Sequence, residues 1–358
     1  MNPLIPGIGL IFFSALCNAG VGVPLRLRRR YQWENMWIVG HAFAMLILPL
    51  GVAKFLVPDW PAAVRAVGPA TIAIIMAFGF MWGIGCVTFA IGIDTIGLSL
   101  GYAIIMGIIT SVGALIPMAR RWSEIPTGAS IVILIGIAVC IAGVAVCGRA
   151  GIIREKAVDQ NVPASLARES GSSTPSSLIK KSAAGVFAIG LAWCILSGVF
   201  SAGNNLGFDF ADRVATEAVK LGTSPVYASL ARFLAVYWGG YLAVLILCGG
   251  RMLRTGSWRN YAGAGAGRDA ALSFAMGAFH FTSQIAYGAG AYYVGRLGTS
   301  VGFAVMISAS IILANLFGFF TGEWKTAVTS SIRTLYLGLI MLIIAVLILA
   351  YGNTLVPA

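Results

Sequence analysis

Residues 96–106 read IGLSLGYAIIM, and residues 297–307 read LGTSVGFAVMI. Four of the eleven aligned positions are identical, and most of the others match in size and polarity. A weaker similarity relates SALCNAG, at residues 14–20, to SGVFSAG, at residues 197–203. Chance similarity between apolar segments is the alternative explanation, and two matches in the same register make it the weaker one. The sequence therefore predicts an internal repeat.

The repeat lies in an unusually apolar chain. Of its 358 residues, 59% are hydrophobic and 10% are charged, whereas soluble domains carry roughly 25% charged residues. The mean hydropathy is +0.90. A soluble fold of this length cannot hide so much apolar surface, so the solvent must be lipid. This composition excludes cytosolic enzymes, secreted domains and nucleic-acid-binding proteins.

Ten stretches approach the roughly 20 apolar residues that a membrane-spanning helix needs. Very short turns join the third span to the fourth and the eighth to the ninth, which predicts antiparallel helical hairpins. The repeat then pairs span 1 with span 6 and span 4 with span 9. Units with an odd number of spans must be inverted in the membrane, which is typical of alternating-access transporters. The spans are 4–25, 35–57, 69–91, 96–118, 129–147, 183–207, 225–248, 270–291, 297–320 and 334–352.

The predicted fold is thus an all-α polytopic membrane protein, with ten transmembrane helices arranged as two inverted five-helix repeats. Residues 1–148 would form the first repeat and residues 183–358 the second. Residues 149–182, between them, are rich in Ser and Ala with mixed charge. Such a composition predicts a flexible cytoplasmic linker.

Basic residues predict the orientation. The net charge is +12, and most of the 24 Lys and Arg residues lie in the loops that follow odd-numbered spans. The positive-inside rule places these loops in the cytoplasm, so both termini are predicted to face outward. The opening MNPLIPGIGLIFF lacks the basic start of a secretory signal, which favours a retained first span.

The sequence offers no familiar catalytic pattern. It contains two histidines, no HExxH, GxSxG or P-loop motif, and six cysteines without metal-ligand spacing. The run GFMWGIG at residues 79–85 has spaced glycines, but inside an apolar span these indicate close helix packing. We therefore expect a protein that is not an enzyme and has no cofactor, and the missing nucleotide motif argues against a primary pump.

Polar groups inside spans are costly, which makes them candidates for function. Amides beside aromatic rings suit a neutral sugar, because amides hydrogen-bond hydroxyls while rings cover apolar C–H faces. Gln284 and Tyr287, one turn apart on a repeat hairpin, form the strongest pair. The alternatives are interhelical hydrogen bonds for the amides and interfacial belts for the rings. The other substrate-binding candidates are Asn18, Asn205, Trp37 and Trp82.

A proton-coupled carrier needs a carboxyl group that both sides of the membrane can reach. Glu34, which begins span 2, and Asp209, which follows span 6, are the best candidates. For each, the alternative is an ordinary charge at a helix end. Arg232 lies well inside span 7. It pairs with an outer carboxylate (Asp209, Asp212 or Glu217), snorkels to the interface or binds substrate, and the sequence leaves all three possibilities open.

Several short runs occur in an order that resembles the L-rhamnose–proton symporter family, a branch of the drug/metabolite transporter superfamily. They are WENMW at 33–37, MWGIG at 81–85, IGLSLG at 96–101, FSAG at 200–203, PVY at 225–227, Gln284, and EW at 323–324. The resemblance implies ten helices, an inner-membrane location and import of a 6-deoxyhexose with protons. It also implies roles in the site for Glu34, Trp37, Trp82 and Gln284.

The resulting hypothesis is a secondary carrier that imports L-rhamnose or a related deoxysugar with H⁺, by alternating access, as helices 1–4 rock against helices 6–9. The chain departs from the family pattern at Arg232, in the turn containing Asp94, around Asp209 and in its longer linker. Helices 5 and 10 are expected to be a scaffold or a homodimer contact, and membrane lipid is the other partner. The rival hypotheses are a metabolite exporter of the same superfamily and a non-transporting membrane sensor, and Na⁺ coupling stays open.

Overall fold

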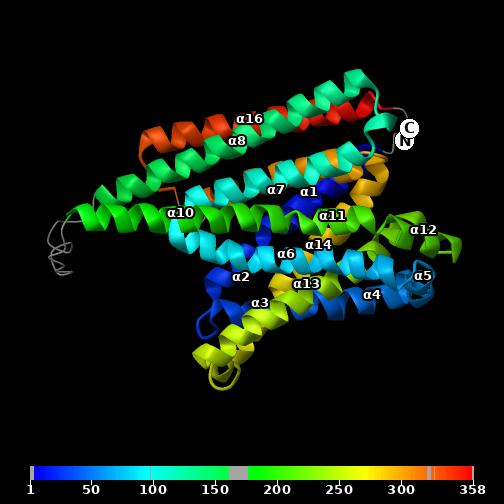
Figure 1. The fold of residues 1–358 in the computed structure, drawn as a ribbon, viewed down its shortest axis with the longest axis horizontal. Helices are drawn as coiled ribbons and strands as arrows, with labels where there is room; N and C mark the ends of the chain where they lie inside the picture. Colours follow the sequence, from blue (N-terminus) through cyan, green and yellow to red (C-terminus); the bar gives the residue numbers. More distant parts are fainter. Residues whose placement is uncertain (1–3, 97, 161–175, 321–323, 326, 357–358) are drawn as a thin grey trace.

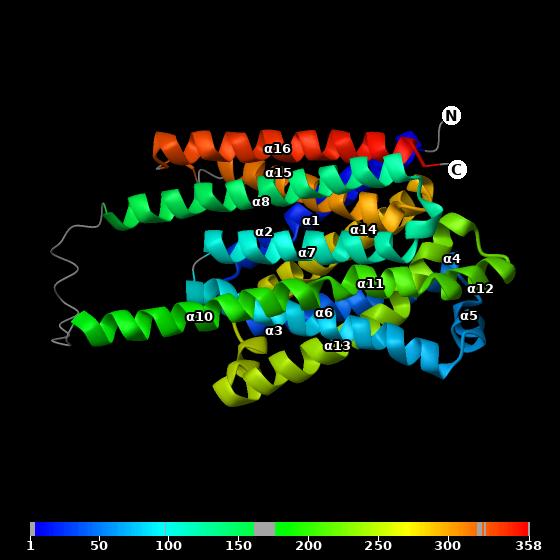
Figure 2. The same cartoon turned by 45° about the horizontal axis from the view of Figure 1, so that its top comes forward.

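The computed structural model describes residues 4–96, 98–160, 176–320, 324–325 and 327–356. Every regular element within these ranges is a helix, which confirms the all-α prediction. Most helices run along the long direction of the molecule, and the first helix begins at the end of the bundle where the last one finishes (Figures 1 and 2).

In the first half of the chain, two predicted spans are interrupted. Span 1 consists of α1 (Leu4–Gly20) and α2 (Gly22–Leu27). Span 2 consists of α3 (Trp33–Ala42) and α4 (Leu48–Leu56), joined by the π-helical turn η1 (Phe43–Ile47). Such π-helical turns frequently lie at functional sites. The remaining elements are α5 (Trp60–Ala66), α6 (Pro69–Ile96), α7 (Leu98–Arg120), η2 (Trp122–Glu124) and α8 (Thr127–Gln160).

The second half contains comparable interruptions. Span 6 is divided into α10 (Ser176–Ser201), α11 (Gly203–Phe210) and α12 (Asp212–Lys220). Span 9 begins with the π-helical turn η4 (Gly298–Gly302) and continues as α15 (Phe303–Phe320). The other elements are α13 (Pro225–Thr255), η3 (Ser257–Tyr261), α14 (Ala266–Val294) and α16 (Thr329–Thr354).

The predicted linker is partly helical, because α8 extends to Gln160 and α10 begins at Ser176. Residues 161–175 of that linker lie outside the described residues.

Eight helical stretches among the described residues are long and apolar enough to cross a membrane. The predicted span at 96–118 appears there as a shorter apolar helix, Ile104–Arg120. The span at 270–291 lies within α14, which is long enough but more polar. Its buried positions include Ser273, Ser283 and Gln284. Polar side chains on this helix are therefore turned toward protein rather than lipid.

Helix packing arranges the bundle as two groups and a pair at one edge. These parts also touch one another, because α3 packs on α13, α7 on α8 and α15 on α16. α6 packs along α10 and α13, and α7 packs on α10; we call α6, α7 and α10–α13 the first lobe. α14 packs along α1 and α3, and α15 packs on α1; we call α1–α4, α14 and α15 the second lobe. α8 and α16 lie side by side at one edge (Figures 1 and 2). Each lobe combines helices from both halves of the chain, unlike the grouping by sequence order that we predicted.

Glycine permits the close approach of α6 and α13. A Cβ atom on Gly79 would lie 1.9 Å from the carbonyl oxygen of Val236, and a Cβ atom on Gly239 would lie 1.9 Å from that of Met76. Neither distance leaves room for a side chain, so both crossings require glycine. The glycines of residues 79–85 thus serve helix packing, as the sequence indicates.

Candidate functional site

Four rings meet where the two lobes face each other. Trp82 on α6 and Tyr237 on α13 come from the first lobe, and His41 on α3 and His280 on α14 come from the second. The rings of Trp82 and His280 stack, with centroids 5.5 Å apart and planes at 16°. The Tyr237 ring lies 6.3 Å from Trp82, and the His41 ring lies 6.0 Å from His280. We call these four residues the central ring cluster.

Four of the buried polar atoms without partners belong to this cluster or lie close to it. Within the described part of the chain, Trp37 Nε1, Tyr237 Oη, His280 Nε2 and Asn204 Oδ1 have no hydrogen-bond partner. Trp37 adjoins the cluster through His41, at a ring distance of 5.2 Å. An unpaired buried polar atom costs about 1–3 kcal/mol, which a hydrogen-bonding ligand would recover. Donors and acceptors beside aromatic faces suit a hydroxylated ligand such as a sugar.

An amide pair joins the lobes next to the cluster. Asn204 on α11 donates to Oε1 of Gln284 on α14 at 3.3 Å. Gln284 lies one helical turn beyond His280, so this amide pair forms one wall of the same region. Both side chains are buried. The predicted residue Gln284 therefore lies at the contact between lobes.

A second amide, Asn205, connects three further elements. It donates to the carbonyl oxygens of Gly113 on α7 and Thr299 on η4, each at 2.7 Å. It accepts a hydrogen bond from the hydroxyl of Tyr287 on α14 at 2.5 Å. The predicted residues Asn205 and Tyr287 thus come together, but their polar atoms are already paired with protein.

Asp209 lies at the end of the bundle that we predict to face outward. We call Asp209 and its partners Arg120, Arg121 and Thr299 the Asp209 layer. The buried carboxylate forms ion pairs with Arg120 and Arg121, at the end of α7, the latter at 2.7 Å. Thr299 on η4 donates to Asp209 Oδ1 at 2.8 Å. Thr299 lies on η4, which leads into α15 of the second lobe, so the Asp209 layer joins the lobes at this end.

Arg232 forms an ion pair with a carboxylate. Its guanidinium contacts Asp212 at 2.5 Å and lies 5.0 Å from the centroid of the Phe208 ring. Of the three possibilities that the sequence left open, pairing with an outer carboxylate is the one observed. Glu217 pairs instead with Lys220, at 2.8 Å.

Glu34 lies buried at the opposite end of the lobe contact. Ser257 donates to its Oε1 atom at 2.9 Å, and Thr255 does so at 3.4 Å. The Nε atom of Arg251 lies 3.5 Å from Glu34 Oε2. These partners lie at the end of α13 and on η3, so Glu34 connects the second lobe to the first, as Asp209 does at the other end.

Asn18, like Arg232, lies outside the central ring cluster, and the sequence analysis missed several residues of that cluster. Asn18 donates to Ser310 on α15 at 3.2 Å, the interhelical role given above as the alternative. Sequence analysis counted the two histidines only as evidence against catalysis. Their positions inside apolar spans were a usable signal, because intramembrane polar groups are functional candidates. The site residues that the sequence analysis missed are His41, His280 and Tyr237.

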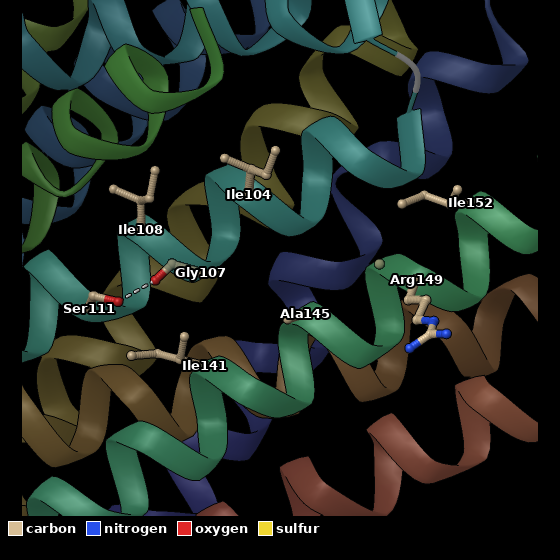
Figure 3. Close-up of a pocket in the computed structure, with 9 residues that line it drawn as sticks. Ile104, Gly107, Ile108, Ser111, Ile141, Ala145, Arg149 and Ile152 are labelled. Atoms are coloured by element: carbon tan, nitrogen blue, oxygen red, sulfur yellow. Dashed lines mark hydrogen bonds between the residues drawn. The ribbon is translucent and has the colours of Figure 1, made fainter. Parts of the chain in front are cut away.

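A hollow between α7 and α8 has a different chemistry (Figure 3). It measures about 350 Å³ and is lined mainly by aliphatic side chains, with Arg149 among them. The hydroxyl of Ser111 in this lining donates to the carbonyl oxygen of Gly107 at 2.6 Å. This groove suits a lipid acyl chain better than a sugar, because a sugar's hydroxyls would lose water there without gaining partners.

Apolar helices around a polar, aromatic cluster between two lobes define a multi-pass membrane protein with a candidate internal site, as expected of a membrane carrier. A family model described as L-rhamnose-proton symport protein (RhaT) matches residues 1–355. The chain belongs to this family, which confirms the resemblance found in the sequence. It is therefore a transporter of the inner membrane and not an enzyme.

Curated relatives carry the name L-rhamnose-proton symporter. The chain is 28% identical to the protein of Cronobacter sakazakii, 25% identical to that of Pectobacterium atrosepticum and 26% identical to that of Mannheimia succiniciproducens. Each comparison covers 98% of this chain and 98% of the relative.

Proposed function

We propose that the protein imports L-rhamnose, or a closely related deoxysugar, together with H⁺. The observation that carries this proposal is the central ring cluster, where unpaired polar atoms and aromatic faces from both lobes converge. A 6-deoxyhexose offers hydroxyls to the polar atoms. Its methyl group and C–H faces offer apolar surface to the rings. The names of the relatives support the same pair of substrates.

Within this site, Trp82 and Trp37 cover the sugar, and the indole of Trp37 also donates a hydrogen bond. Gln284, with Asn204, orients the hydroxyls from the lobe contact. Asn205 and Tyr287 close the site on its outer side. We assign Asn18 and Arg232 to helix packing and to the outer ion pair, because each has a protein partner there.

We propose that the chain is a ten-span inverted repeat, with residues 1–148 and 183–358 as its halves and residues 149–182 as the cytoplasmic linker. The packing supports this, because contacts recur five spans apart. α6 along α10 has its counterpart in α14 along α1, and α7 on α10 has its counterpart in α15 on α1. The fifth members of the two halves, α8 and α16, pack on each other.

Transport by alternating access follows from this arrangement, with the two lobes as the moving bodies. α8 and α16 then serve as the scaffold, and their outer faces provide the predicted homodimer contact. We place the basic loops in the cytoplasm and both termini in the periplasm. The first helix begins and the last helix finishes at the same end of the bundle, which supports placing both termini on one side of the membrane.

Glu34 and Asp209 are the proposed proton-responsive carboxylates at the two ends of the lobe contact. Each is buried and each is bonded to groups across that contact or beside it. Protonation removes the negative charge that attracts Arg251 at one end and Arg120 and Arg121 at the other. Loss of that attraction loosens the corresponding end, which links the proton to the movement of the lobes.

Uptake of labelled L-rhamnose into proteoliposomes tests this function. We expect accumulation driven by an inwardly directed proton gradient, abolished by a protonophore, and weakened by Glu34→Gln. A Na⁺ gradient without a pH gradient should drive no accumulation. Uptake that ignores the pH gradient would contradict proton coupling. Exchange of amines or nucleosides in place of rhamnose would favour the exporter hypothesis, and exchange of no solute would favour the sensor.

A further inference from the structure

The two histidines of the chain meet in the interior of the protein. His41 comes from the first half of the sequence and His280 from the second, near the middle of α14. Their ring centroids lie 6.0 Å apart, with planes at 40°. Two imidazoles brought together from distant spans, at the contact between lobes, form a titratable pair that the carrier mechanism above leaves unused.

The hydrogen bonds define how the pair can take up a proton. His41 Nδ1 lies 2.8 Å from the carbonyl oxygen of Trp37. A carbonyl oxygen can only accept, so Nδ1 carries the hydrogen and Nε2 keeps its lone pair. His280 Nε2 is buried without a hydrogen-bond partner among the described residues. Both imidazoles therefore have a nitrogen that is open to a proton or to a ligand hydroxyl.

The groups that face the pair come from four helices. Trp82 on α6 stacks on His280, and Tyr237 on α13 lies 6.5 Å from the same ring, so its phenol is the titratable neighbour from the first lobe. Trp37 on α3 and Asn204 on α11, the latter through Gln284, add no charge.

Several other titratable groups on these helices are bonded at a distance from the pair, and two are thiols. On α3, Glu34 lies two turns from His41 and is bonded to Ser257. On α14, Asp269 accepts backbone hydrogen bonds at the helix start, and Tyr287 is bonded to Asn205. The free thiols are Cys86 on α6 and Cys248 on α13.

We propose that His41 and His280 form the proton-binding site beside the sugar. Glu34 and Asp209 then lie at the two ends of the contact between the lobes. This inference rests on the proposed function and names the site that the transported proton occupies. Imidazole is suited to the role because its ordinary pKa lies nearest to physiological pH. A proton from the outer water adds to a free imidazole nitrogen, giving an imidazolium. In the inward-open state the N–H bond breaks and the proton returns to water.

The same geometry explains why proton and sugar would bind together. A buried imidazolium without an anion is costly, and the charged ring gains from its stack on Trp82 by a cation–π contact. Sugar hydroxyl oxygens that accept from the imidazolium N–H groups lower the cost further. Each ligand then increases the affinity for the other by the same factor, which is the condition for coupled transport.

Proteoliposomes separate coupling from sugar binding. We expect His280→Gln and the double variant His41→Gln/His280→Gln to accumulate no rhamnose above equal concentrations under a proton gradient. Exchange of labelled for unlabelled rhamnose should continue in both variants, with a raised KM, because the sugar loses the imidazole as a hydrogen-bonding partner. Ser283→Ala is the matched control, because Ser283 is buried on the same helix and bonds to Ser14, outside the cluster. This control should accumulate sugar as the wild type does.

Accumulation by the double variant at the wild-type level would overturn the proposal. If the double variant does not fold, wild-type protein in detergent decides the question with a pH indicator. Rhamnose should cause proton uptake by the wild type and none by His280→Gln alone; equal uptake by both would overturn the proposal. The proposed function fails in a distinguishable way, because wild-type protein would then exchange no rhamnose at all.

Discussion

The buried polar atoms of this protein fall into two kinds. Those of Asp209 and Asn205 are bonded to several protein groups. Those of Trp37, Tyr237 and His280 have no partner within the described residues. Because an unpaired buried polar atom is costly, the second kind marks the position where a ligand is expected. At that position the ring of Trp82, from the first lobe, stacks on His280 of the second lobe.

Replacement of Trp82 should weaken sugar binding. The ring stacks on His280 and contacts Tyr237, so it forms an apolar wall of the site. Removal of a stacking ring costs about 1.4 kcal/mol, which corresponds to about a tenfold change in affinity. We expect Trp82→Ala to raise the KM for rhamnose uptake about tenfold and Trp82→Phe to raise it less.

Trp60→Phe is the control for this experiment, because Trp60 packs on Trp238, outside the central ring cluster. Its KM should match the wild-type value. A normal KM in Trp82→Ala would place the sugar elsewhere.

Pairs of helices in this fold depend on local features that tolerate little change. The crossing of α6 and α13 leaves no room for a Cβ atom at Gly79 or Gly239. The junction between α2 and α3 depends on one carboxylate, since the backbone N–H groups of Arg30 and Tyr31 donate to Asp269 Oδ2 at 2.7 and 2.8 Å. Both features connect segments that are far apart in the sequence.

Gly79→Ala should destabilise the protein. The new methyl group would meet the carbonyl oxygen of Val236, and separating the helices to accommodate it costs about 1–3 kcal/mol. The matched control is Gly51→Ala on α4, where the new Cβ atom meets nothing within 4 Å. Thermal unfolding in detergent should show a lower melting temperature for Gly79→Ala alone. Equal melting temperatures would mean that the two helices are not in such close contact.

Asp269 should stabilise the protein in a pH-dependent way. Burial by itself would raise the pKa of this carboxyl group, but hydrogen bonds from the backbone of Tyr31, Arg30 and Arg29, with the charge of Arg268, lower it below its ordinary value. The stabilisation is therefore complete above the unfolded-state pKa of about 3.9 and is lost as the pH falls through the lower folded-state pKa.

Asp269→Ala removes all three backbone bonds. Hydrogen bonds to a charged group contribute about 1.5–3 kcal/mol each, and we expect a loss of stability of at least that size at neutral pH. Asp269→Asn keeps one acceptor oxygen and should lose less. Thermal unfolding across a pH series measures both, and the difference from the wild type should shrink in acid. A constant difference at all pH values would contradict the assigned role of the charge.

In the whole molecule, two lobes of mixed sequence origin enclose the central ring cluster. The Asp209 layer and the bond from Tyr287 to Asn205 join them at one end. Glu34 and its partners Ser257 and Arg251 join them at the other. A carrier that works by alternating access must break one set of contacts while it keeps the other. The Asp209 layer is the natural test of the end that we propose to face outward.

Asp209→Asn should open this end. Ser300 follows Thr299 on η4 and is buried, so Ser300→Cys in a cysteine-free background should resist a membrane-impermeant thiol reagent. The same cysteine should be labelled at a several-fold higher rate when Asp209→Asn is added, because the variant loses the charge that Arg120 and Arg121 hold. Ser123→Cys, at an exposed position on η2, is the control and should be labelled equally in both backgrounds.

Unchanged labelling of Ser300→Cys would show that the Asp209 layer does not hold the outer end closed. Absence of labelling at Ser123→Cys from outside the cell would contradict the orientation instead.

Several residues that the sequence analysis named by chemical type lie together in the structure. Gln284, Trp82 and Trp37 lie in or beside the central ring cluster, because an intramembrane amide or indole is informative wherever it occurs. Sequence analysis named Asp212 as one of three possible partners of Arg232 but could not choose among them, because the choice depends on the packing of α12 against α13. It also passed over Tyr237 and both histidines, whose importance depends on which rings they meet.

The sequence by itself determined the solvent of this protein, its helical class and its family. These follow from local hydrophobicity, because lipid forces each span to satisfy its own backbone hydrogen bonds as a helix. Only the tertiary structure decided which helices share a lobe and which polar side chains stay unpaired. Packing between spans depends on shape over long sequence separations, as at Gly79 and Gly239, and no local property of the chain records it.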